Sequence, residues 1–546
     1  MSIARKTALI LVGLAIGLPA EAALGQQAKK ARKPKAGPGQ YKRVHQRIMK
    51  QLLAGRYDEA AAAAKKVLQK QPGDVESLYC LAIAQARTGD AKAANATVKR
   101  AVEAGLSLGR FLAGPRDLLR PLVESPGFGA LLKERPIELL HGPMVGCVTD
   151  RSARFWVRTA SEATVQVAVS PSAKLEDPLR SAAVRTRKTR DTTAVAEVTG
   201  LKADTRYHYD VLIGGKSTMP KQPWSFRTVV PAGRKAKFQV GFGGGAGYVP
   251  PNERVWDTIC KHRPTAFLFL GDNVYIDAPQ SPDMQRYCYY RRQSRPEYHR
   301  LIASTAIYAI WDDHDFGLND CSGGPQINEP EWKIPVWRVF CNNWNNPSYG
   351  GGEKQPGCWF DFAVGEVHFF MTDGRYYRTE PRKTPKEERS MLGPVQKRWL
   401  LDRLKASKAT FKVIASGTPW TFFAKGKSQD TWNGFQKERG EIFSFLADNR
   451  IDGVVLLSAD RHRHDVWKIP RDKGYDLYEF ETSRLTNQHV HPTMKQAEFS
   501  WNKSQGFGLL TFDTTLADPT VTYQIVSIDD EVIHTFTVKK SQLTSK

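Results

Sequence analysis

Six short apolar segments, each followed at once by polar residues, constrain the fold of this chain most strongly. Helical stretches such as residues 394–404 and 440–449 lie between several of them. Continuous apolar strands that alternate with helices predict an α/β sheet covered on both faces. The polar clusters should then meet at one edge, outside the carboxyl ends of the strands. The six segments are Phe238–Phe242, Ala266–Leu270, Ile307–Ile310, Val367–Met371, Phe411–Ala415 and Val454–Leu457.

The periodicity of the 546-residue chain changes twice before these strands begin. Residues 41–110 are predicted to be helical. The segment Gly55-Arg-Tyr-Asp-Glu-Ala60 recurs as Gly89-Asp-Ala-Lys-Ala-Ala94, a shift of 34 residues (89 − 55). This period resembles that of a tetratricopeptide repeat. Residues 140–230 alternate like half-buried strands and predict a small β-sandwich of the fibronectin kind. Residues 234–540 carry the six strands. We therefore expect a multidomain α/β protein with a helical-repeat head, a small β-sandwich and a mixed α/β sandwich domain.

The amino terminus carries the pattern of a secretory signal peptide. Arg5 and Lys6 precede the apolar run Ala8–Leu18, and Ala20-Glu-Ala22 offers a small-x-small cleavage site. We predict a signal peptide over 1–22 and a basic linker over 23–40. An uncleaved membrane anchor is the competing interpretation, although the apolar run is short for a full span. The protein is thus expected to be exported, to the periplasm or the extracellular space.

Charge and cysteine content narrow the classes of partner. The formal net charge is +24, and part of it lies in the basic segment Lys29–Lys35. This segment is either a solvated arm or a tether for an anionic envelope surface. No nucleic-acid-binding motif accompanies the charge, so sequence-specific nucleic-acid recognition is not expected.

The seven cysteines show no CxxC spacing, which argues against a zinc-thiolate knuckle. One or two disulfides are compatible with an oxidising compartment, and Cys321, Cys341 and Cys358 form the closest cluster.

The polar clusters themselves predict a metal centre. Three carboxylates and an imidazole crowd into Asp312-Asp-His-Asp315, where like charges raise one another's pKa unless a cation is present. Oxygen donors mixed with imidazole suit Fe, Mn, Zn or Ca. Alone, a Gly-Asp pair after a strand or an Asp-x-His pair is commonplace, but their joint occurrence in order favours a site. The candidates are Asp272, Tyr275, Asp277, Asp312, Asp313, His314, Asp315, Asp373, Asp460, His462 and His464.

Such a centre predicts a phosphoester hydrolase. Two cations about 4 Å apart would neutralise the carboxylates, polarise a phosphoryl oxygen and generate a hydroxide that attacks phosphorus in line. Arg375 and Arg378 could each hold phosphate bidentately, or could be ordinary salt-bridging residues. The leaving alkoxide needs a proton, which His314 or His462 would supply.

Several motifs in order carry a family resemblance. The chain resembles the PhoD-like alkaline phosphatases of the calcineurin-like metallophosphoesterase superfamily over residues 140–540, because that family also has an amino-terminal β-sandwich. The helical head lies outside the family pattern. The motifs are Gly271–Tyr275, Trp311–Asp315, Thr372–Arg375, Leu392-Gly393 with Gln396 and Trp399-Leu400, and Ser458–His462.

The resemblance implies an exported phosphomonoesterase and phosphodiesterase with iron and calcium at its centre. By position, Asp272 would bridge the metals, Tyr275 would ligate the ferric ion and Asp313 would be a further ligand. His314 would lie near the phosphate as a ligand or proton donor. Asp460 and His462 would complete the far side of the centre, and Arg375 would bind the substrate.

The chain departs from the family after its first strand. The family has a Ser-Cys pair there, whereas this chain has the glycine-rich segment Gly243–Gly247. Loss of the thiolate should weaken selection for iron, which leaves Mn, Zn, a single metal, or a water or substrate oxygen in the gap as alternatives. The glycines could also let backbone amides approach a phosphate.

Two other functions stay open from the sequence. One is a weakened hydrolase-fold binding protein that presents residues 41–106 to a protein partner. The other is a phospholipase-like diesterase, which the basic charge balance also suits. The sequence identifies neither the natural substrate nor the oligomeric state.

Overall fold

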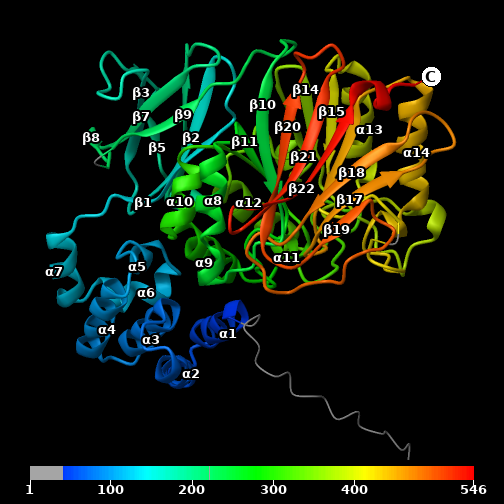
Figure 1. The fold of residues 1–546 in the computed structure, drawn as a ribbon. Helices are drawn as coiled ribbons and strands as arrows, with labels where there is room; N and C mark the ends of the chain where they lie inside the picture. Colours follow the sequence, from blue (N-terminus) through cyan, green and yellow to red (C-terminus); the bar gives the residue numbers. More distant parts are fainter. Residues whose placement is uncertain (1–40, 221, 423, 546) are drawn as a thin grey trace, which may run out of the picture. The chain divides into compact units, whose positions relative to one another are not determined.

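The structure, a computed structural model, describes residues 41–546 except Lys221, Phe423 and Lys546 (Figure 1). Residues 38–546 form one compact unit. The predicted signal peptide and basic linker lie outside the described residues. Within the described part of the chain, no helix is both long enough and apolar enough to span a bilayer.

Two helix pairs form the repeat predicted in the head. Gly55 and Gly89, at equivalent places in the repeat, have φ of 75° and 90° and lie in the turns that follow α1 and α3. These left-handed turns suit glycine and fix the crossing of each pair. Three shorter helices complete the head. The helices are α1 Tyr41–Leu53, α2 Tyr57–Lys70, α3 Val75–Arg87, α4 Ala91–Glu103, α5 Arg110–Ala113, α6 Arg116–Val123 and α7 Pro126–Glu134.

The head packs directly on the mixed α/β domain, beyond the β-sandwich in sequence. The Tyr287 hydroxyl of α9 (Pro282–Gln293) donates to Glu76 of α3 at 2.7 Å, and its ring stacks on Tyr79 with centroids 6.4 Å apart. Two repeats are fewer than a free-standing solenoid needs, so this contact supplies the missing apolar neighbour.

The small β-sandwich has two sheets. One is ordered β1-β2-β6, and the other β4-β3-β7-β8 with β5 on β3 and β9 on β7. Phe155 of β2 packs between Tyr209 of β7 and Phe226 of β9, with centroids 4.7 and 5.4 Å away. The strands are β1 Leu139–Gly146, β2 Ser152–Thr159, β3 Thr164–Ser170, β4 Leu179–Arg180, β5 Val184–Arg185, β6 Thr193–Thr199, β7 Arg206–Ile213, β8 Lys216–Ser217 and β9 Trp224–Arg227.

The six apolar strands do not form one sheet, so that expectation is wrong. They divide equally between two sheets that face each other, which is why each run is apolar throughout. The first sheet is ordered β12 (Ala306–Ile310), β11 (Ala266–Leu270), β10 (Lys237–Gly243), β20 (Gly506–Asp513), β21 (Thr520–Ser527), β22 (Val532–Lys539). The second is ordered β13 (Phe360–Val364), β14 (Val367–Met371), β15 (Phe411–Ala415), β16 (Val454–Ser458), β18 (Leu477–Thr482), β17 (His464–Ile469), β19 (Phe499–Trp501).

Aromatic side chains fill the space between the two sheets. Phe512 of β20 lies 5.8 Å from the rings of Phe369 and Phe411, and Phe480 of β18 lies 4.6 Å from Tyr523 of β21. Burial of each large aromatic ring in this layer contributes roughly 2–3 kcal/mol. The interface is therefore a principal core of the protein.

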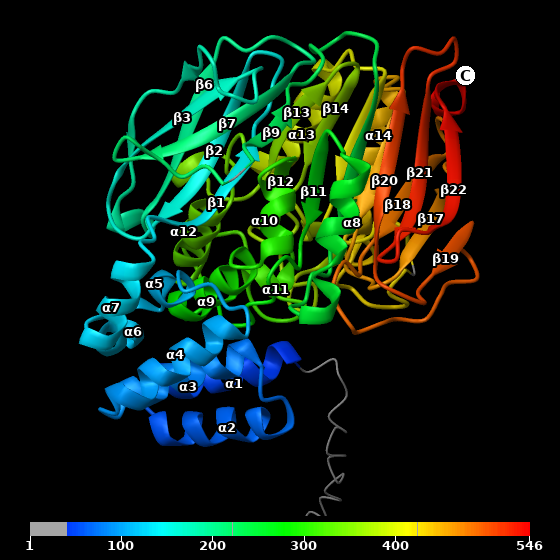
Figure 2. The ribbon, with the colours of Figure 1, turned by 60° about the vertical axis from the view of Figure 1, so that its left-hand side comes forward.

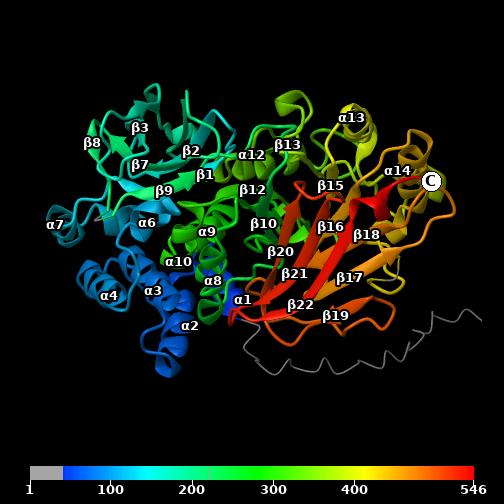
Figure 3. The same cartoon turned by 45° about the horizontal axis from the view of Figure 1, so that its top comes forward.

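Helices cover the outer faces of both sheets. Phe269 of β11 packs against Trp256 of α8 (Val255–His262) and Tyr298 of α10 (Pro296–Ile302), and Figure 2 shows both helices in front of this sheet. Helices α13 (Gly393–Ala406) and α14 (Gln436–Asp448) lie on the side of the second sheet away from β20–β22 (Figure 3). Helix α12 spans Lys333–Asn343.

The two sheets are joined at the edge where the polar clusters emerge. Gly244, just beyond β10, forms a parallel bridge with Ser483, just beyond β18, and its amide donates to the Thr482 carbonyl at 3.1 Å. This bridge brings the loops after β10–β12 next to those after β16 and β18. The clusters therefore meet, although they come from two sheets.

Candidate metal centre

The loops after β11 and β12 place acidic side chains within reach of one ion. Ligand atoms of Asp272, Asp313 and His314 lie within 4.8 Å of one another. A Cβ on Gly271 would lie 2.5 Å from the Asp312 Cβ, so glycine permits this approach of the two loops. Asp313 starts the short helix α11 (Asp313–Phe316), which aims the following imidazole at the same point.

Some of these carboxylate oxygens are buried without a partner. Oδ1 of Asp272, Oδ2 of Asp312 and Oδ1 of Asp313 have no hydrogen bond among the described residues. Burial raises the pKa of Asp313, and the guanidinium of Arg375, 3.8 Å away, only partly opposes this rise. Unpaired buried carboxylates are costly. The donor set therefore fits a cation.

His314 sits among these carboxylates with its ring held in place. Its Nδ1 lies 2.5 Å from Oδ1 of Asp277. Burial lowers the pKa of His314, but Asp272, Asp313 and Asp277 outweigh that effect and raise it to about 10. The imidazole thus carries a proton at neutral pH, and Nε2 is its remaining ring nitrogen.

The loop after β16 adds the second half of the predicted ligand set. Nε2 of His462 lies 2.7 Å from the Tyr275 hydroxyl and 3.9 Å from Oδ2 of Asp272. Burial holds the pKa of His462 well below its usual value, which favours the neutral ring that binds metals. The structure therefore brings Asp272, Tyr275 and His462 together. Asn487, which the sequence analysis missed, donates to the Tyr275 hydroxyl at 2.6 Å.

Arg375 is placed differently from its expected role in substrate binding. It is fully buried, with Nε 2.5 Å from Asp312 and Nη1 2.7 Å from Asp430. Nη1 also donates to the Cys321 carbonyl, and Nη2 contacts Asp430 and Asp313. The guanidinium is therefore occupied by carboxylates of the chain, because three of them converge on it.

Asp460 is also neutralised by cations of the chain. Its Oδ2 lies 3.3 Å from Lys425 and 3.5 Å from Arg461. Burial would raise the pKa of Asp460, but these two cations lower it to about 2. Lys425 bridges to Asp430 at 2.7 Å as well. Acidic charge on this side of the centre is thus balanced, whereas no Lys or Arg of the described chain lies within 4 Å of the Asp272 carboxylate and Asp313 has only the 3.8 Å contact with Arg375.

Three candidates from the sequence serve the scaffold. Asp315 accepts the backbone amides of Asn273 and Val274 at 2.9 and 3.0 Å and so shapes the loop after β11. Asp373 accepts the Trp311 indole at 2.8 Å. His464 lies within β17, buried against Trp501 with centroids 5.3 Å apart.

The glycine-rich segment does not form a phosphate cradle. The amides of Gly244, Gly245 and Ala246 donate to the carbonyls of Thr482, Gly271 and Asp272. A Cβ on Gly245 would meet His462 Cδ2 and Ser483 Oγ at 3.1 Å. The glycines thus allow close packing of backbone against His462, and the three amides already have acceptors.

The head contributes a residue to the centre that sequence reasoning missed. The ammonium of Lys42, in α1, lies 3.1 Å from the centroid of the Tyr275 ring. A lysine on an amphipathic helix ordinarily faces solvent, so nothing in the local pattern distinguished it.

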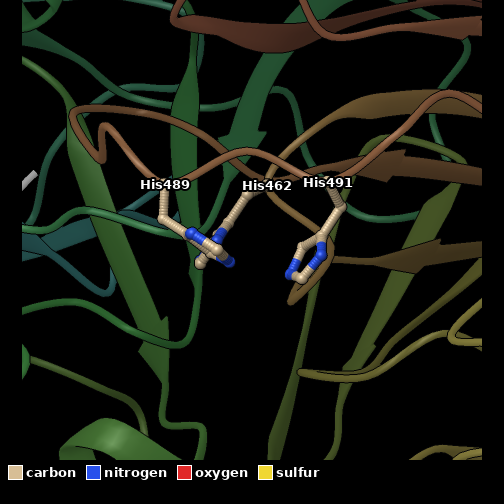
Figure 4. Close-up of side chains that lie close together, drawn as sticks. All are labelled: His462, His489 and His491. Carbon is tan, nitrogen blue, oxygen red and sulfur yellow. The ribbon is translucent and has the colours of Figure 1, made fainter. Parts of the chain in front are cut away.

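Two further histidines, His489 and His491, lie beside His462 (Figure 4). Their His-x-His spacing was a signal that the sequence analysis did not use.

All seven cysteines lie in the described part of the chain, and none is paired there. The suggested disulfides therefore do not appear. The cysteines also take no part in the groups of metal-ligating side chains found among the described residues.

Family models match three parts of the chain. Residues 241–510 match PhoD-like phosphatase, residues 136–231 match a domain of unknown function (DUF7800), and residues 51–106 match the tetratricopeptide repeat. Alkaline phosphatase D of Bacillus subtilis (strain 168) is 29% identical over 118 residues, which cover 18% of this chain and 20% of that protein. The sequence match thus spans about a fifth of the relative.

Solved structures share the fold. A structure of PhoD superposes with a TM-score of 0.63 at 16% identity, covering 74% of this chain and 90% of that one. The purple acid phosphatase PPD1 from yellow lupin (Lupinus luteus) seeds gives a TM-score of 0.53 at 11% identity, covering 73% and 75%.

The paired sheets meet at an edge where carboxylates and imidazoles suited to a metal ion lie close together. Residues 241–510 match the PhoD-like phosphatase family model, and the ordered motifs lie within this range. The tetratricopeptide assignment of the head is likewise confirmed.

Proposed function

We propose that this protein hydrolyses phosphate monoesters and diesters at the centre built by Asp272, Tyr275, Asp313, Asp460 and His462. The observation that carries the proposal is the set of buried carboxylate oxygens on Asp272, Asp312 and Asp313 that have no hydrogen bond in the described chain. A site so rich in uncompensated negative charge suits cations, and through them an anionic phosphoryl group.

The donor set guides the choice of metal. Asp272, Asp313 and Tyr275 offer oxygen, and His462 offers nitrogen. Without a thiolate this set suits Ca, Mn, Zn or Fe rather than iron alone. When bound, such ions supply Lewis-acid polarisation of the phosphoryl oxygen and a more acidic water.

The chain's own side chains perform the remaining tasks. His314, held by Asp277, gives the proton on Nε2 to the leaving alkoxide. Lys42 offers an ammonium without a carboxylate within 4 Å in the described chain, so it contacts a phosphoryl oxygen. Arg375, whose guanidinium contacts Asp312, Asp313 and Asp430, orients these carboxylates, and its expected role in substrate binding stays a prediction.

Elemental analysis of protein purified without chelator, combined with turnover of an aryl phosphate monoester and a bis-aryl diester, tests the proposal. We expect at least one bound ion per chain and hydrolysis of both substrates that chelation abolishes and metal restores. No stoichiometric metal and no turnover after reconstitution would overturn it. Hydrolysis of the diester alone would instead support the diesterase alternative.

We also propose, from the pattern of residues 1–22, that the protein is exported and that the signal peptide is removed ahead of the helical head. The test is fractionation of cells that express the full chain. Mature protein in the periplasm or medium with its amino terminus near residue 23 is expected, and full-length protein confined to the cytosol would contradict export.

A further inference from the structure

Three imidazoles converge beside the carboxylate half of the centre. His489 and His491 lie on the loop after β18, two positions apart, and Val490 between them is 41% exposed. This alternation directs both imidazoles to the same side of the loop. Figure 4 shows the His489 and His491 rings turned toward that of His462, which comes from the loop after β16.

The nitrogen atoms are close enough to share one ion. Each residue offers a ring nitrogen, and these three atoms lie within 4.8 Å of one another. Ring centroids of His462 lie 5.2 Å from His489 and 5.6 Å from His491. His462 is only 7% exposed, and its Nδ1 is buried with no hydrogen-bond partner in the described chain. An unpartnered buried imidazole nitrogen is costly.

The loop that carries the two histidines is anchored to the centre. The Asn487 side chain contacts both the Tyr275 hydroxyl and Nε2 of His462, at 2.6 and 3.1 Å. Its Oδ1 accepts the backbone amide of His489, and Asn502 donates to the His491 carbonyl at 2.8 Å. The backbone of the His489–His491 segment is thus held at both ends, while the two rings have no hydrogen-bond partner in the described chain.

We propose that His462, His489 and His491 together hold a zinc-class divalent transition ion, and that this is the ion which His462 binds in the proposed hydrolytic centre, since a neutral imidazole gives its lone pair to one ion; the inference rests on that proposal. Three imidazoles with an open fourth position are an established arrangement for Zn²⁺, and imidazole equally suits Co²⁺ and Cu²⁺. Calcium and magnesium prefer oxygen ligands, so this site discriminates against them.

Modest movement of exposed side chains completes the site. A tetrahedral ion with Zn–N bonds of about 2.0–2.1 Å places its nitrogens about 3.4 Å apart. His489 is exposed and His491 half-buried, so their rings can rotate to close the remaining distance while His462 stays fixed. The loop thereby supplies nitrogen ligands next to the Gly243–Gly247 segment, which offers no side-chain donor.

Binding of Co²⁺ and Zn²⁺ to chelator-treated full-length protein tests this inference. Calorimetry gives the stoichiometry, and Co²⁺ reports nitrogen coordination through its visible absorption. The variant His489→Ala/His491→Ala should lose one zinc-class ion, or bind it at least tenfold more weakly, with its melting temperature unchanged. The matched control Val490→Ala, in the same loop, should bind as the wild type does. His491→Cys keeps a zinc ligand and should restore binding relative to the double variant.

The outcome is distinguishable from failure of the proposed hydrolase. Asp313→Ala removes a carboxylate ligand and should leave the three-histidine ion in place. Wild-type stoichiometry and affinity in the double histidine variant would overturn the inference, whatever the turnover. Loss of every ion in Asp313→Ala would overturn it too, because the three imidazoles would then hold none alone.

Discussion

Lys42 of the helical head and Tyr275 of the catalytic domain are direct neighbours, with the lysine ammonium 3.1 Å from the centre of the tyrosine ring. One turn along α1, Gln46 donates to the Tyr275 carbonyl at 2.5 Å. Burial lowers the pKa of Lys42 to about 7, although Asp272 and Asp277 favour its charged form. The repeat-like head therefore belongs to the centre.

Replacing Lys42 should weaken substrate binding. A charge-assisted hydrogen bond contributes about 1.5–3 kcal/mol, so Lys42→Ala should raise KM for a phosphate monoester by roughly tenfold or more. Inhibition by inorganic phosphate should weaken in parallel, and Lys42→Arg should recover part of both. Lys50→Ala, an exposed lysine on the same helix, is the control. Unchanged KM and phosphate inhibition in Lys42→Ala would exclude this role.

Removing one carboxylate ligand should abolish metal retention and turnover together. Asp313→Ala deletes an oxygen donor that lies within 4.8 Å of those of Asp272 and His314. Metal ions supply several kcal/mol of transition-state stabilisation, so kcat/KM should fall by about 1,000-fold or more. Metal analysis and steady-state kinetics on the same preparation check this, with the exposed Asp402→Ala as control. Full turnover in Asp313→Ala would disprove the ligand assignment.

A side chain at Gly245 should displace His462, and so destabilise the protein more than the backbone strain of a positive φ does by itself. Gly245 has φ of 67°, and a Cβ there would lie 3.1 Å from His462 Cδ2. Gly426 has φ of 60° with nothing within 4 Å of its added Cβ, so Gly426→Ala measures the strain alone, about 1–2 kcal/mol. Gly245→Ala should cost more in the free energy of unfolding and also weaken metal binding. Equal losses in both variants, with metal affinity intact, would contradict the packing argument.

Metal-free protein should lose stability as the pH rises. Burial, reinforced by Asp272, raises the pKa of Asp315 to about 7 despite its backbone hydrogen bonds. A carboxyl with a raised folded-state pKa contributes stability below its unfolded pKa, and that contribution is lost as pH rises through the folded value. Between pH 4 and 7 the loss is on the order of 1.4 kcal/mol per unit.

Denaturant unfolding of chelator-treated protein between pH 4 and 8 measures this slope. Asp315→Asn, which cannot ionise, should flatten it over that window. An identical slope in the wild type and Asp315→Asn would assign the pH dependence to other groups.

The sequence predicted the elements better than their assembly. All six apolar strands exist, but β20–β22 and β18 separate them into two sheets, and such long-range pairing leaves no local signal. The motifs named Asp272, Tyr275, Asp313 and His462, which lie close together because each follows a strand that fixes the position of its loop. Their roles as ligands stay predictions.

What the sequence missed depends on tertiary contact. Lys42 looks like a surface residue of an amphipathic helix until α1 is docked on Tyr275. Arg375 looks like a phosphate ligand until Asp430, on a distant loop, reaches it at 2.7 Å. His489 and His491 follow β18, whose alternating pattern was not recognised as a strand, so their association with His462 was not visible.

The bridge between Gly244 and Ser483 joins distant parts of the chain, so the complete metal centre forms late in folding. The carboxylates come from residues 272–315 and the three clustered imidazoles from residues 462–491, a separation of 147 positions between the two groups (462 − 315). Contacts so distant in sequence form slowly, since the entropy of closing the loop is lost first. A chain emerging from the ribosome thus exposes the acidic half, with His314, long before His462, His489 and His491 exist. The first bound cation would hold the loops after β11 and β12 together, because neutralising Asp272 and Asp313 removes the repulsion between them.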